Sequence, residues 1–362
     1  MKMKKTKFYS IHEKLGAKIV DFAGFQMPVL YSSIINEHKA VRTSVGVFDV
    51  SHMGEIFIRG DKALDFVQHI TINDASILID GRVQYSAMCY KDGGIVDDLL
   101  VYKISDKEFM LVVNASNKDK DFVWMKENNP FNVSIEDESD EYSLLAVQGP
   151  SSKQVIEKIC DKPLDLEYYH FFKANVAGVD MILSRTGYTG EIGYELYFKG
   201  DESVALKVWN ALFESGKEFN IQPVGLGARD SLRLEMGFCL YGNDIDQTTN
   251  PLEAGLGWIT KLKKPSFIAR DVLLKVKEEG LKRKLVPMIS EEKAFPRHGY
   301  DLSLNGKKIG HITSGTVSPV IDKAIALGYV DSEYAIEGNQ INFLIRGKEI
   351  PAVIIKLPFV KK

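Results

Sequence analysis

Two adjacent carboxylates interrupt an apolar strand in the first third of the chain, and this feature limits how that region can fold. The stretch from Tyr85 to Tyr102 predicts a β-hairpin, with Asp92 and Gly93 as a two-residue turn, because Asp and Gly tolerate the positive φ angles of a primed turn. Aspartate is depleted in strands, and a buried carboxylate is costly unless it is paired. We therefore expect Asp97-Asp98 to contain a functional carboxylate.

The predicted turn also fixes a register that separates the two aspartates. A two-residue turn places Tyr90 opposite Ile95, and side chains then alternate between the two faces of the sheet. Asp98 shares its face with Tyr85 and Tyr102, whereas the preceding aspartate points to the other face. One carboxylate flanked by two tyrosines can hold a flat ring with basic nitrogens. A solvated strand end is the alternative, and the hairpin alone does not decide between them.

Length and composition narrow the class of protein. A chain of 362 residues exceeds one typical core, so two or three domains are expected, and 45% hydrophobic with 26% charged residues is typical of a soluble globular protein. The net charge of −3 gives no indication of nucleic-acid binding, and no apolar run has the length of a membrane span. The three cysteines are widely separated, which argues against a disulfide framework or a zinc site. We expect a cytoplasmic protein without bound metal.

The pattern along the chain predicts α+β layers followed by a small β domain. Strand-like and helical segments alternate without a strict βαβ rhythm, and residues 61–70 form an amphipathic pattern typical of a helix. From about Lys284 short strands dominate, and Asn305-Gly306 predicts a tight turn between two of them. The Lys-rich helical stretch 271–284 is the best candidate for a linker.

Two further segments are candidates for ligand contacts. The glycine-rich stretch 185–196 contains Tyr188 and Glu195, which can supply stacking and a hydrogen-bond acceptor. Taken alone, the glycines are explained slightly better by a plain hairpin connection. Arg229 and Arg233 stand four residues apart on a predicted helix, where they can grip a carboxylate together. A solvated or salt-bridged helix face is the alternative for this pair.

The stretch 47–55 contains the residue types of a hydrolase triad, Asp49, Ser51 and His52. Adjacent residues on a strand point apart, so the serine and histidine cannot meet locally, and a serine-hydrolase role is rejected. Met53 beside a glycine is better suited to form a wall for a flat apolar group.

Taken together and in order, these segments resemble the T-protein family of the glycine cleavage system, the tetrahydrofolate-dependent aminomethyltransferases. The resemblance covers essentially the whole chain. The stretches that carry it are Asp21–Pro28, Val47–Glu55, Gly93–Asp98, Val147–Pro150, Ser184–Gly190, Gly225–Asp230, Asn250–Trp258, Ile312–Gly315 and Ser318-Pro319.

The resemblance implies a three-domain cloverleaf of the α+β class. Its first two domains are interleaved antiparallel-sheet and helix domains, residues 1–54 with 140–242 and residues 55–139 with 243–275. The third is a β-rich, barrel-like domain over residues 284–362. Alternation of elements alone would have missed this interleaving.

The resemblance also implies roles for individual residues. Asp98 corresponds to the family's catalytic aspartate, which the hairpin register selects independently. Met53, Tyr85 and Tyr102 would line the pterin site. The remaining implied contacts are Glu195 to the pterin, Tyr188 to the folate and Arg229 to its glutamyl carboxylate.

The implied reaction moves the methylene of an aminomethyl group from the lipoylated H protein to tetrahydrofolate, with release of ammonia. The implied protein is a monomer that needs no metal, membrane or nucleic acid. Lys261, Lys263 and Lys264 are examples of lysines that can serve the weak docking of the carrier. A folate-dependent demethylase acting on a sulfonium or methylamine donor is the alternative within this fold. A folate-binding protein that supports iron–sulfur enzymes is less favoured, because residues 264–270 lack the cysteine motif of those relatives.

Overall fold

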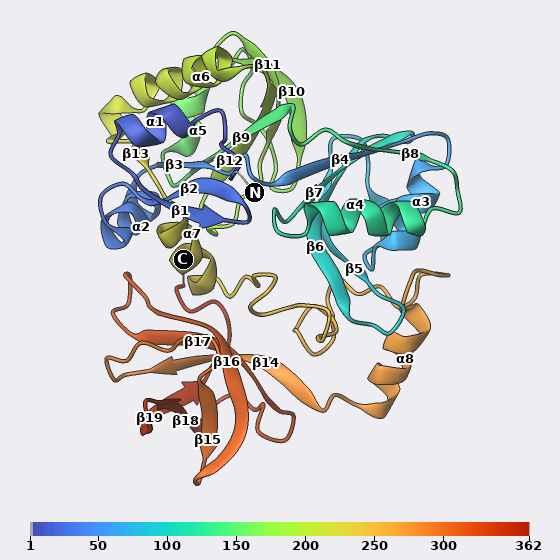
Figure 1. Ribbon diagram of the computed structural model, residues 1–362, viewed down its shortest axis with the longest axis vertical. Helices are drawn as coiled ribbons and strands as arrows, with labels where there is room; N and C mark the ends of the chain where they lie inside the picture. The colour runs from blue at the N-terminus through green and yellow to red at the C-terminus, as the bar shows by residue number, and fades with distance from the viewer. Residues whose placement is uncertain (1–2, 362) are drawn as a thin grey trace. The chain divides into compact units, whose positions relative to one another are not determined.

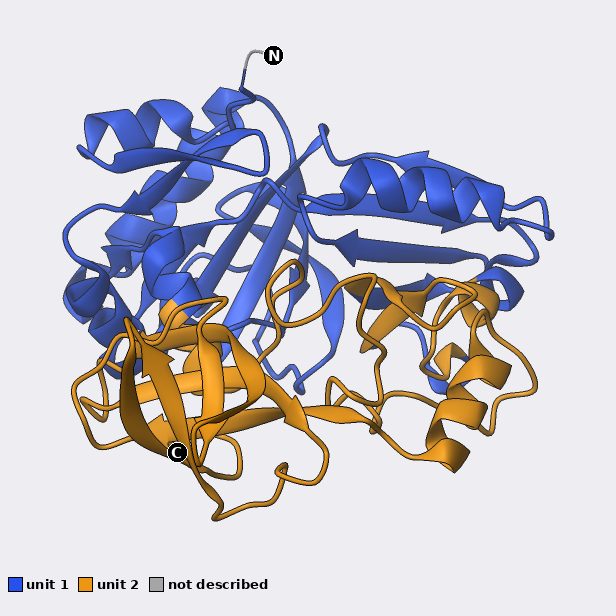
Figure 2. Ribbon diagram, turned by 60° about the horizontal axis from the view of Figure 1, so that its bottom comes forward, with its two compact units in different colours: residues 1–66, 76–84, 99–230 blue, residues 67–75, 85–98, 231–362 orange. Residues whose placement is uncertain are grey.

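The structure is a computed structural model that describes residues 3–361 (Figure 1). Two compact units divide the chain, and both are assembled from segments distant in sequence (Figure 2). Unit 1 comprises residues 1–66, 76–84 and 99–230, and unit 2 comprises residues 67–75, 85–98 and 231–362. Segments of the two units therefore alternate along the chain, as an interleaved fold requires. The domain boundaries given above stay a prediction.

A mixed six-stranded sheet forms the core of unit 1, with helices packed on it. Helix α6 (Glu202–Ser215) shows why such a segment forms a helix and packs on the sheet. Asp201 caps its first turn by accepting from the Val204 N–H, and its apolar residues recur at helical spacing on one buried face. Helices α1 (Tyr9–Lys14) and α5 (Ser152–Glu157) contribute to the same apolar cluster. In spatial order the strands are β10 (Phe171–Val176), β11 (Val179–Ser184), β12 (Gly193–Lys199), β9 (Tyr142–Gln148), β3 (Gly46–Asp49) and β13 (Gln222–Pro223).

A second, five-stranded sheet carries the hairpin singled out in the sequence. Its order is β5 (Val83–Cys89), β6 (Ile95–Ser105), β7 (Glu108–Val113), β4 (Gly54–Arg59) and β8 (Ser134–Asp137). The boundary between the two units passes through β5 and β6. Two helices belong to this part of the sequence, α3 (Ala63–Ile70), which confirms the predicted amphipathic helix, and α4 (Lys118–Glu127).

The hairpin is confirmed, but its predicted turn is wrong by one residue. Gly93 N–H donates to the Tyr90 carbonyl (2.9 Å) and Tyr90 N–H donates to the Gly94 carbonyl (2.8 Å), so the loop contains three residues and Tyr90 lies opposite Gly94. Gly93 has a φ of 95°, typical of the glycine that closes a three-residue loop with a bulge. Ile95, the predicted partner of Tyr90, instead donates its N–H to the carbonyls of Asp246 and Thr249.

The C-terminal part of unit 2 is a closed six-stranded barrel, as the β-rich pattern predicted. The strands around it are β14 (Arg283–Ser290), β17 (Ala324–Asp331), β16 (Lys307–Val317), β15 (Asp301–Leu304), β18 (Gln340–Ile345) and β19 (Lys348–Ile354). The predicted turn is confirmed: Asn305 and Gly306 have φ angles of 53° and 73°, as a type I′ turn requires, and join β15 to β16. The interior of the barrel is apolar and contains Met288, Ile312 and Phe343.

The remaining elements are short. They are the hairpin β1 (Lys18–Phe22) with β2 (Phe25–Leu30), helices α2 (Ile34–Thr43), α7 (Leu226–Glu235) and α8 (Arg270–Glu279), and two 3₁₀ turns, η1 (Ala75–Ile77) and η2 (Lys217–Phe219). Helix α8 lies in the stretch predicted as a linker and precedes the first barrel strand. Within residues 3–361, every helix falls short of the length and apolarity needed to cross a membrane.

Candidate active site

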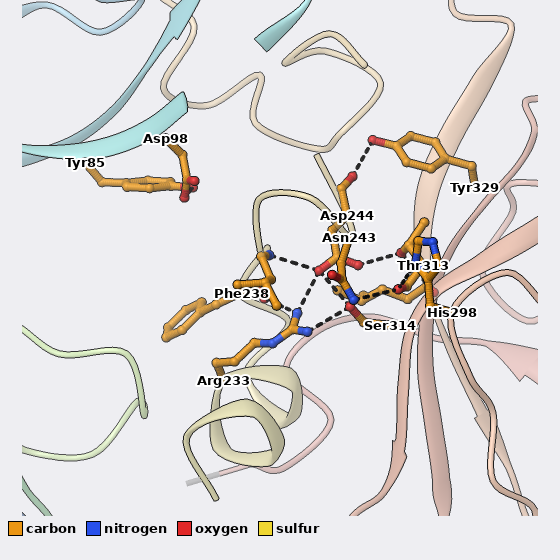
Figure 3. A network of polar contacts seen from close by, with 12 residues as sticks. Tyr85, Asp98, Arg233, Phe238, Asn243, Asp244, His298, Thr313, Ser314 and Tyr329 are labelled. Atoms are coloured by element: carbon orange, nitrogen blue, oxygen red, sulfur yellow. Dashed lines mark hydrogen bonds and ion pairs between the residues drawn. The ribbon is translucent and has the colours of Figure 1, made fainter. Parts of the chain in front are cut away.

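The half-buried carboxylate of Asp98 is the first component of the candidate site, in unit 2. Tyr85 on β5 donates its hydroxyl to Asp98 Oδ2 on β6 at 2.9 Å, and Figure 3 shows the two side chains together at the hairpin. Asp97 is fully buried, whereas Asp98 is partly exposed, in agreement with the prediction that the two carboxylates point apart. The tyrosine fixes the orientation of one carboxylate oxygen, and the exposed part of Asp98 can meet a ligand.

An aromatic surface borders Tyr85 in the same unit. The rings of Tyr85 and Trp258 have centroids 6.2 Å apart and are inclined by 31°. Trp258 is 64% exposed, which is unusual for so large an apolar side chain. A planar ligand that reached Asp98 from this side would find two aromatic rings to contact.

A buried hydroxyl network around Glu195 forms the second component, in unit 1. Thr186 donates its hydroxyl to Glu195 Oε2 at 2.5 Å, and the Tyr197 hydroxyl donates to the same oxygen at 3.2 Å. The Tyr102 hydroxyl contacts Thr186 Oγ1 (3.2 Å), Tyr197 Oη (3.0 Å) and Ser184 Oγ (3.1 Å). Both hydrogen bonds to Glu195 use Oε2, and among residues 3–361 none reaches Oε1, which leaves an acceptor for a ligand N–H.

Tyr102 lies inside this hydroxyl network. Its side chain is fully buried, and burial together with the charge of Glu195 raises the pKa of its hydroxyl. Such a tyrosine stays protonated and donates within the network, without presenting a surface to solvent. Tyr102 is linked to Glu195 through Thr186 and Tyr197, and its contact with the pterin stays a prediction.

Arg229 and Tyr188 form a third component, also in unit 1. The Arg229 guanidinium lies over the Tyr188 ring at 4.8 Å from its centroid, a cation–π arrangement, and both side chains are partly exposed. An arginine placed over a ring in this way can still bind a carboxylate through its N–H groups.

The motif around His52 has a structural explanation. Asp49 Oδ2 contacts His12 Nε2 at 2.9 Å and accepts from the Thr6 hydroxyl at 2.6 Å. Burial favours the neutral carboxyl, but these bonds to His12 and Thr6 outweigh it and lower the pKa of Asp49. Burial, then the charge of Arg229, lowers the pKa of His52 to about 4, so His52 is neutral near pH 7.

Met53 follows His52 in the turn between β3 and β4 and is partly exposed. It lines a small cavity of about 60 Å³ in unit 1, together with His52 and Phe25. The position is compatible with an apolar contact to a ligand. A cavity of this volume is far smaller than the pocket of a drug-sized molecule.

Arg233 does not act together with Arg229. Its guanidinium is buried and donates to Asp244 Oδ2 (2.7 Å) and to Ser314 Oγ (2.8 Å), while Asp244 also accepts from the Thr313 hydroxyl (2.5 Å) (Figure 3). The Tyr329 hydroxyl completes this network by donating to the Asp244 carbonyl at 2.9 Å. Of the two alternatives given for the arginines, the salt-bridged one holds for Arg233, which binds a carboxylate of the protein itself.

Sequence reasoning missed the residues that support the site. Ser184 and Thr186 lie in the stretch 184–190 that carries the family resemblance, but no role was predicted for either of them. For Tyr197 the only hint was the alternation of β12, which places it on the face of Glu195. Asp244 lies in a stretch without helix or strand, so no periodicity marked it. In the described chain, residues 3–361, no group of three His, Cys, Asp or Glu side chains has an arrangement that could hold a metal ion.

Comparison with known proteins accounts for the combination of sheets, barrel and motifs. Residues 8–264 match the family described as the GCVT N-terminal domain, and residues 283–361 match the glycine cleavage T-protein C-terminal barrel domain. The chain belongs to the glycine cleavage T-protein family. Proteins named aminomethyltransferase from Halothermothrix orenii and Flavobacterium psychrophilum are 50% and 51% identical to it, over 99% of this chain and 100% of theirs.

A solved structure agrees with this membership. The glycine cleavage system aminomethyltransferase T from Bartonella henselae matches with a TM-score of 0.92 at 34% identity, covering 99% of this chain and 98% of that one. The family resemblance, the α+β fold with a C-terminal barrel and the aminomethyltransferase activity are thus confirmed, and the demethylase alternative receives no support. Members of this family use tetrahydrofolate as a substrate and act with the H protein.

Proposed function

We propose that this aminomethyltransferase takes the methylene of the aminomethyl group carried by the dihydrolipoyl arm of H protein and transfers it to tetrahydrofolate. The products are ammonia, 5,10-methylenetetrahydrofolate and H protein with its dihydrolipoyl arm free, because the carbon–nitrogen and carbon–sulfur bonds of the aminomethyl group are replaced by two bonds to folate nitrogens. The observation that carries the proposal is the partly exposed Asp98 carboxylate, oriented by the Tyr85 hydroxyl at 2.9 Å. We also expect the protein to act as a cytoplasmic monomer.

The chemistry assigns Asp98 an electrostatic role and a role in proton transfer. Loss of ammonia places positive charge on the methylene carbon, and a fixed carboxylate stabilises that charge. The folate amine loses a proton as it forms the new C–N bond, and a carboxylate within hydrogen-bond reach can accept it. Tyr85 holds one oxygen of Asp98 in place, which limits the reorganisation needed during the reaction.

The other predicted residues are assigned to binding of the folate. Glu195 accepts a pterin N–H through Oε1, and Tyr102 positions that carboxylate through the hydroxyls of Thr186 and Tyr197. Met53 supplies an apolar contact to the pterin. Tyr188 contacts the folate, and Arg229, whose guanidinium lies over the Tyr188 ring, binds its glutamyl carboxylate.

The experiment measures ammonia released from aminomethyl-loaded H protein, with and without tetrahydrofolate. We expect release that depends on folate, with one methylenetetrahydrofolate formed for each ammonia. Asp98→Asn serves as the matched variant, because it keeps the shape of the side chain and removes the charge. Folate binding without ammonia release from the wild-type protein would contradict the proposal and favour a methyl donor.

A further inference from the structure

The last turn of helix α3 is held by an unusual partner, a buried lysine. The carbonyls at the end of a helix have no partners within the helix. Lys264 Nζ donates to the carbonyls of Gln68 (2.9 Å), Thr71 (2.8 Å) and Asn73 (2.7 Å). These three bonds use all the protons of the ammonium group, and they fix the segment that follows α3.

This arrangement is costly, which argues for a specific purpose. Lys264 is 4% exposed, and burial lowers its pKa, opposed by the nearby charge of Asp74. A buried ammonium is stabilised here by carbonyl oxygens and by the negative end of the α3 dipole. Its burial also removes Lys264 from the lysines that can serve carrier docking, whereas Lys263, its neighbour, is exposed.

Asn73 connects the lysine to the catalytic hairpin. Its side-chain amide donates to the Tyr85 carbonyl at 2.9 Å, and its backbone N–H donates to Ser86 Oγ at 3.1 Å. The first bond holds the backbone of β5 at Tyr85, the residue whose hydroxyl donates to Asp98, and the second holds the side chain of the next residue, Ser86. All the residues of this chain of contacts lie in unit 2.

We propose that Lys264 is a positioning residue of the active site: through Asn73 it sets the position of Tyr85 and hence the orientation of the Asp98 carboxylate. This inference rests on the proposed role of Asp98. Lys264 touches neither substrate and acts only through the contacts described above. Displacement of a catalytic group by about 1 Å lowers turnover up to about 100-fold, so small shifts of β5 are measurable.

The test combines Lys264→Met, which removes the ammonium and keeps the aliphatic chain, with Tyr85→Phe, which removes the hydroxyl that orients Asp98. We expect Lys264→Met to lower kcat about tenfold in the wild-type background and less than about twofold in the Tyr85→Phe background, because residues acting through one contact are non-additive. The KM for aminomethyl-loaded H protein should stay unchanged in all four proteins. Lys277→Met, at an exposed position of helix α8 in the same unit, is the control, with kcat and melting temperature expected to match the wild type.

The outcomes separate positioning from stability. A lysine that only supports the fold would lower the melting temperature equally in both backgrounds and would give the same fold-loss of kcat in both; that result, or an unchanged kcat, overturns the proposal. If Lys264→Met does not fold, Asn73→Ala and Ser86→Ala replace it, with the same non-additivity against Tyr85→Phe expected. Failure of the proposed function is recognised separately, by full activity of Asp98→Asn in the same assay.

Discussion

Two aspartates in unit 2 have opposite environments. Asp244 is completely buried, and its carboxylate accepts hydrogen bonds from Arg233, Thr313, Ser314 and the Leu240 N–H. Asp98 is partly exposed at the edge of that unit's hairpin and is oriented by Tyr85 (Figure 3). A carboxylate saturated by the protein stabilises one arrangement of the chain, whereas a carboxylate that is oriented and still accessible can act on a substrate.

The comparison teaches that the environment, and not the residue type, separates structural from catalytic carboxylates. Both aspartates have a polar aromatic or cationic neighbour, and both lie in regions rich in apolar residues. They differ in solvent exposure: the Asp98 carboxylate can be reached by a substrate, and the Asp244 carboxylate cannot. Changing each residue in turn should therefore separate effects on turnover from effects on stability.

The largest effect is expected on turnover, from Asp98→Asn. Removal of the charge should lower kcat about 10²–10⁴-fold, because the carboxylate serves both the developing cation and the proton transfer. Asp97→Asn is the matched change on the neighbouring, buried residue and should lower kcat less. Single-turnover ammonia release measures both. Equal losses would show that orientation on the strand does not distinguish the two carboxylates.

The second largest effect is expected on stability, from Asp244→Asn. This change leaves the Arg233 guanidinium buried without its counter-charge and should lower the free energy of unfolding by about 3–5 kcal/mol. Urea unfolding followed by circular dichroism measures it. Glu279→Gln removes a charge from an exposed pair with Lys275 in the same unit and should change stability by less than about 0.5 kcal/mol. Similar values for both variants would contradict the structural role of the Asp244 network.

The sequence predicted the role of the accessible carboxylate, Asp98, but gave no indication of the fully hydrogen-bonded one, Asp244. The hairpin, its two aspartates and the Asn305-Gly306 turn follow from local rules, since each depends on residues close in the chain. The three-residue loop was missed because Ile95 donates to the carbonyls of Asp246 and Thr249, about 150 residues away. Local turn preferences cannot contain that contact.

The supporting residues were missed for the same physical reason. Thr186 and Tyr197 gain their roles only when β12 brings them to Glu195. Lys264 reads as one of several surface lysines, and only its contacts with residues 68–73 explain its burial. Hydrogen bonds between distant segments have no periodicity, so spacing rules do not find them.

The buried side chain of His52 extends the comparison to a ring nitrogen that has no hydrogen-bond partner among the described residues. His52 is as buried as Asp244, but its Nδ1 has no hydrogen-bond partner among residues 3–361, and burial with the charge of Arg229 lowers its pKa to about 4. Between pH 6.5 and 4 the unfolded chain binds more protons at this residue, so its contribution to stability falls as pH falls. We expect this contribution to drop by about 2 kcal/mol between pH 7 and pH 5.

Replacement of this histidine by a residue that does not titrate measures the effect. His52→Gln should reduce the difference in unfolding free energy between pH 7 and pH 5 by about 2 kcal/mol. Urea unfolding at the two pH values, with the wild type in parallel, gives the comparison. If the variant and the wild type show the same difference between the two pH values, His52 has the same pKa in the folded and unfolded states.

The smallest effect concerns backbone strain, and it should move stability without moving turnover. Ala269, just before α8 in unit 2, has a φ of 75°, which an L-residue adopts at a cost of about 1–2 kcal/mol. Ala269→Gly removes that strain and adds conformational entropy to the unfolded chain, for a net stabilisation of about 0.5–1 kcal/mol. Ala211→Gly, inside helix α6, is the matched control and should destabilise by about 1 kcal/mol. Ala269 lies in the same unit as Asp98 and Asp244. A gain in stability at constant kcat would therefore show that turnover at Asp98 does not depend on the stability of this unit. Loss of stability in both glycine variants would contradict the strain at Ala269.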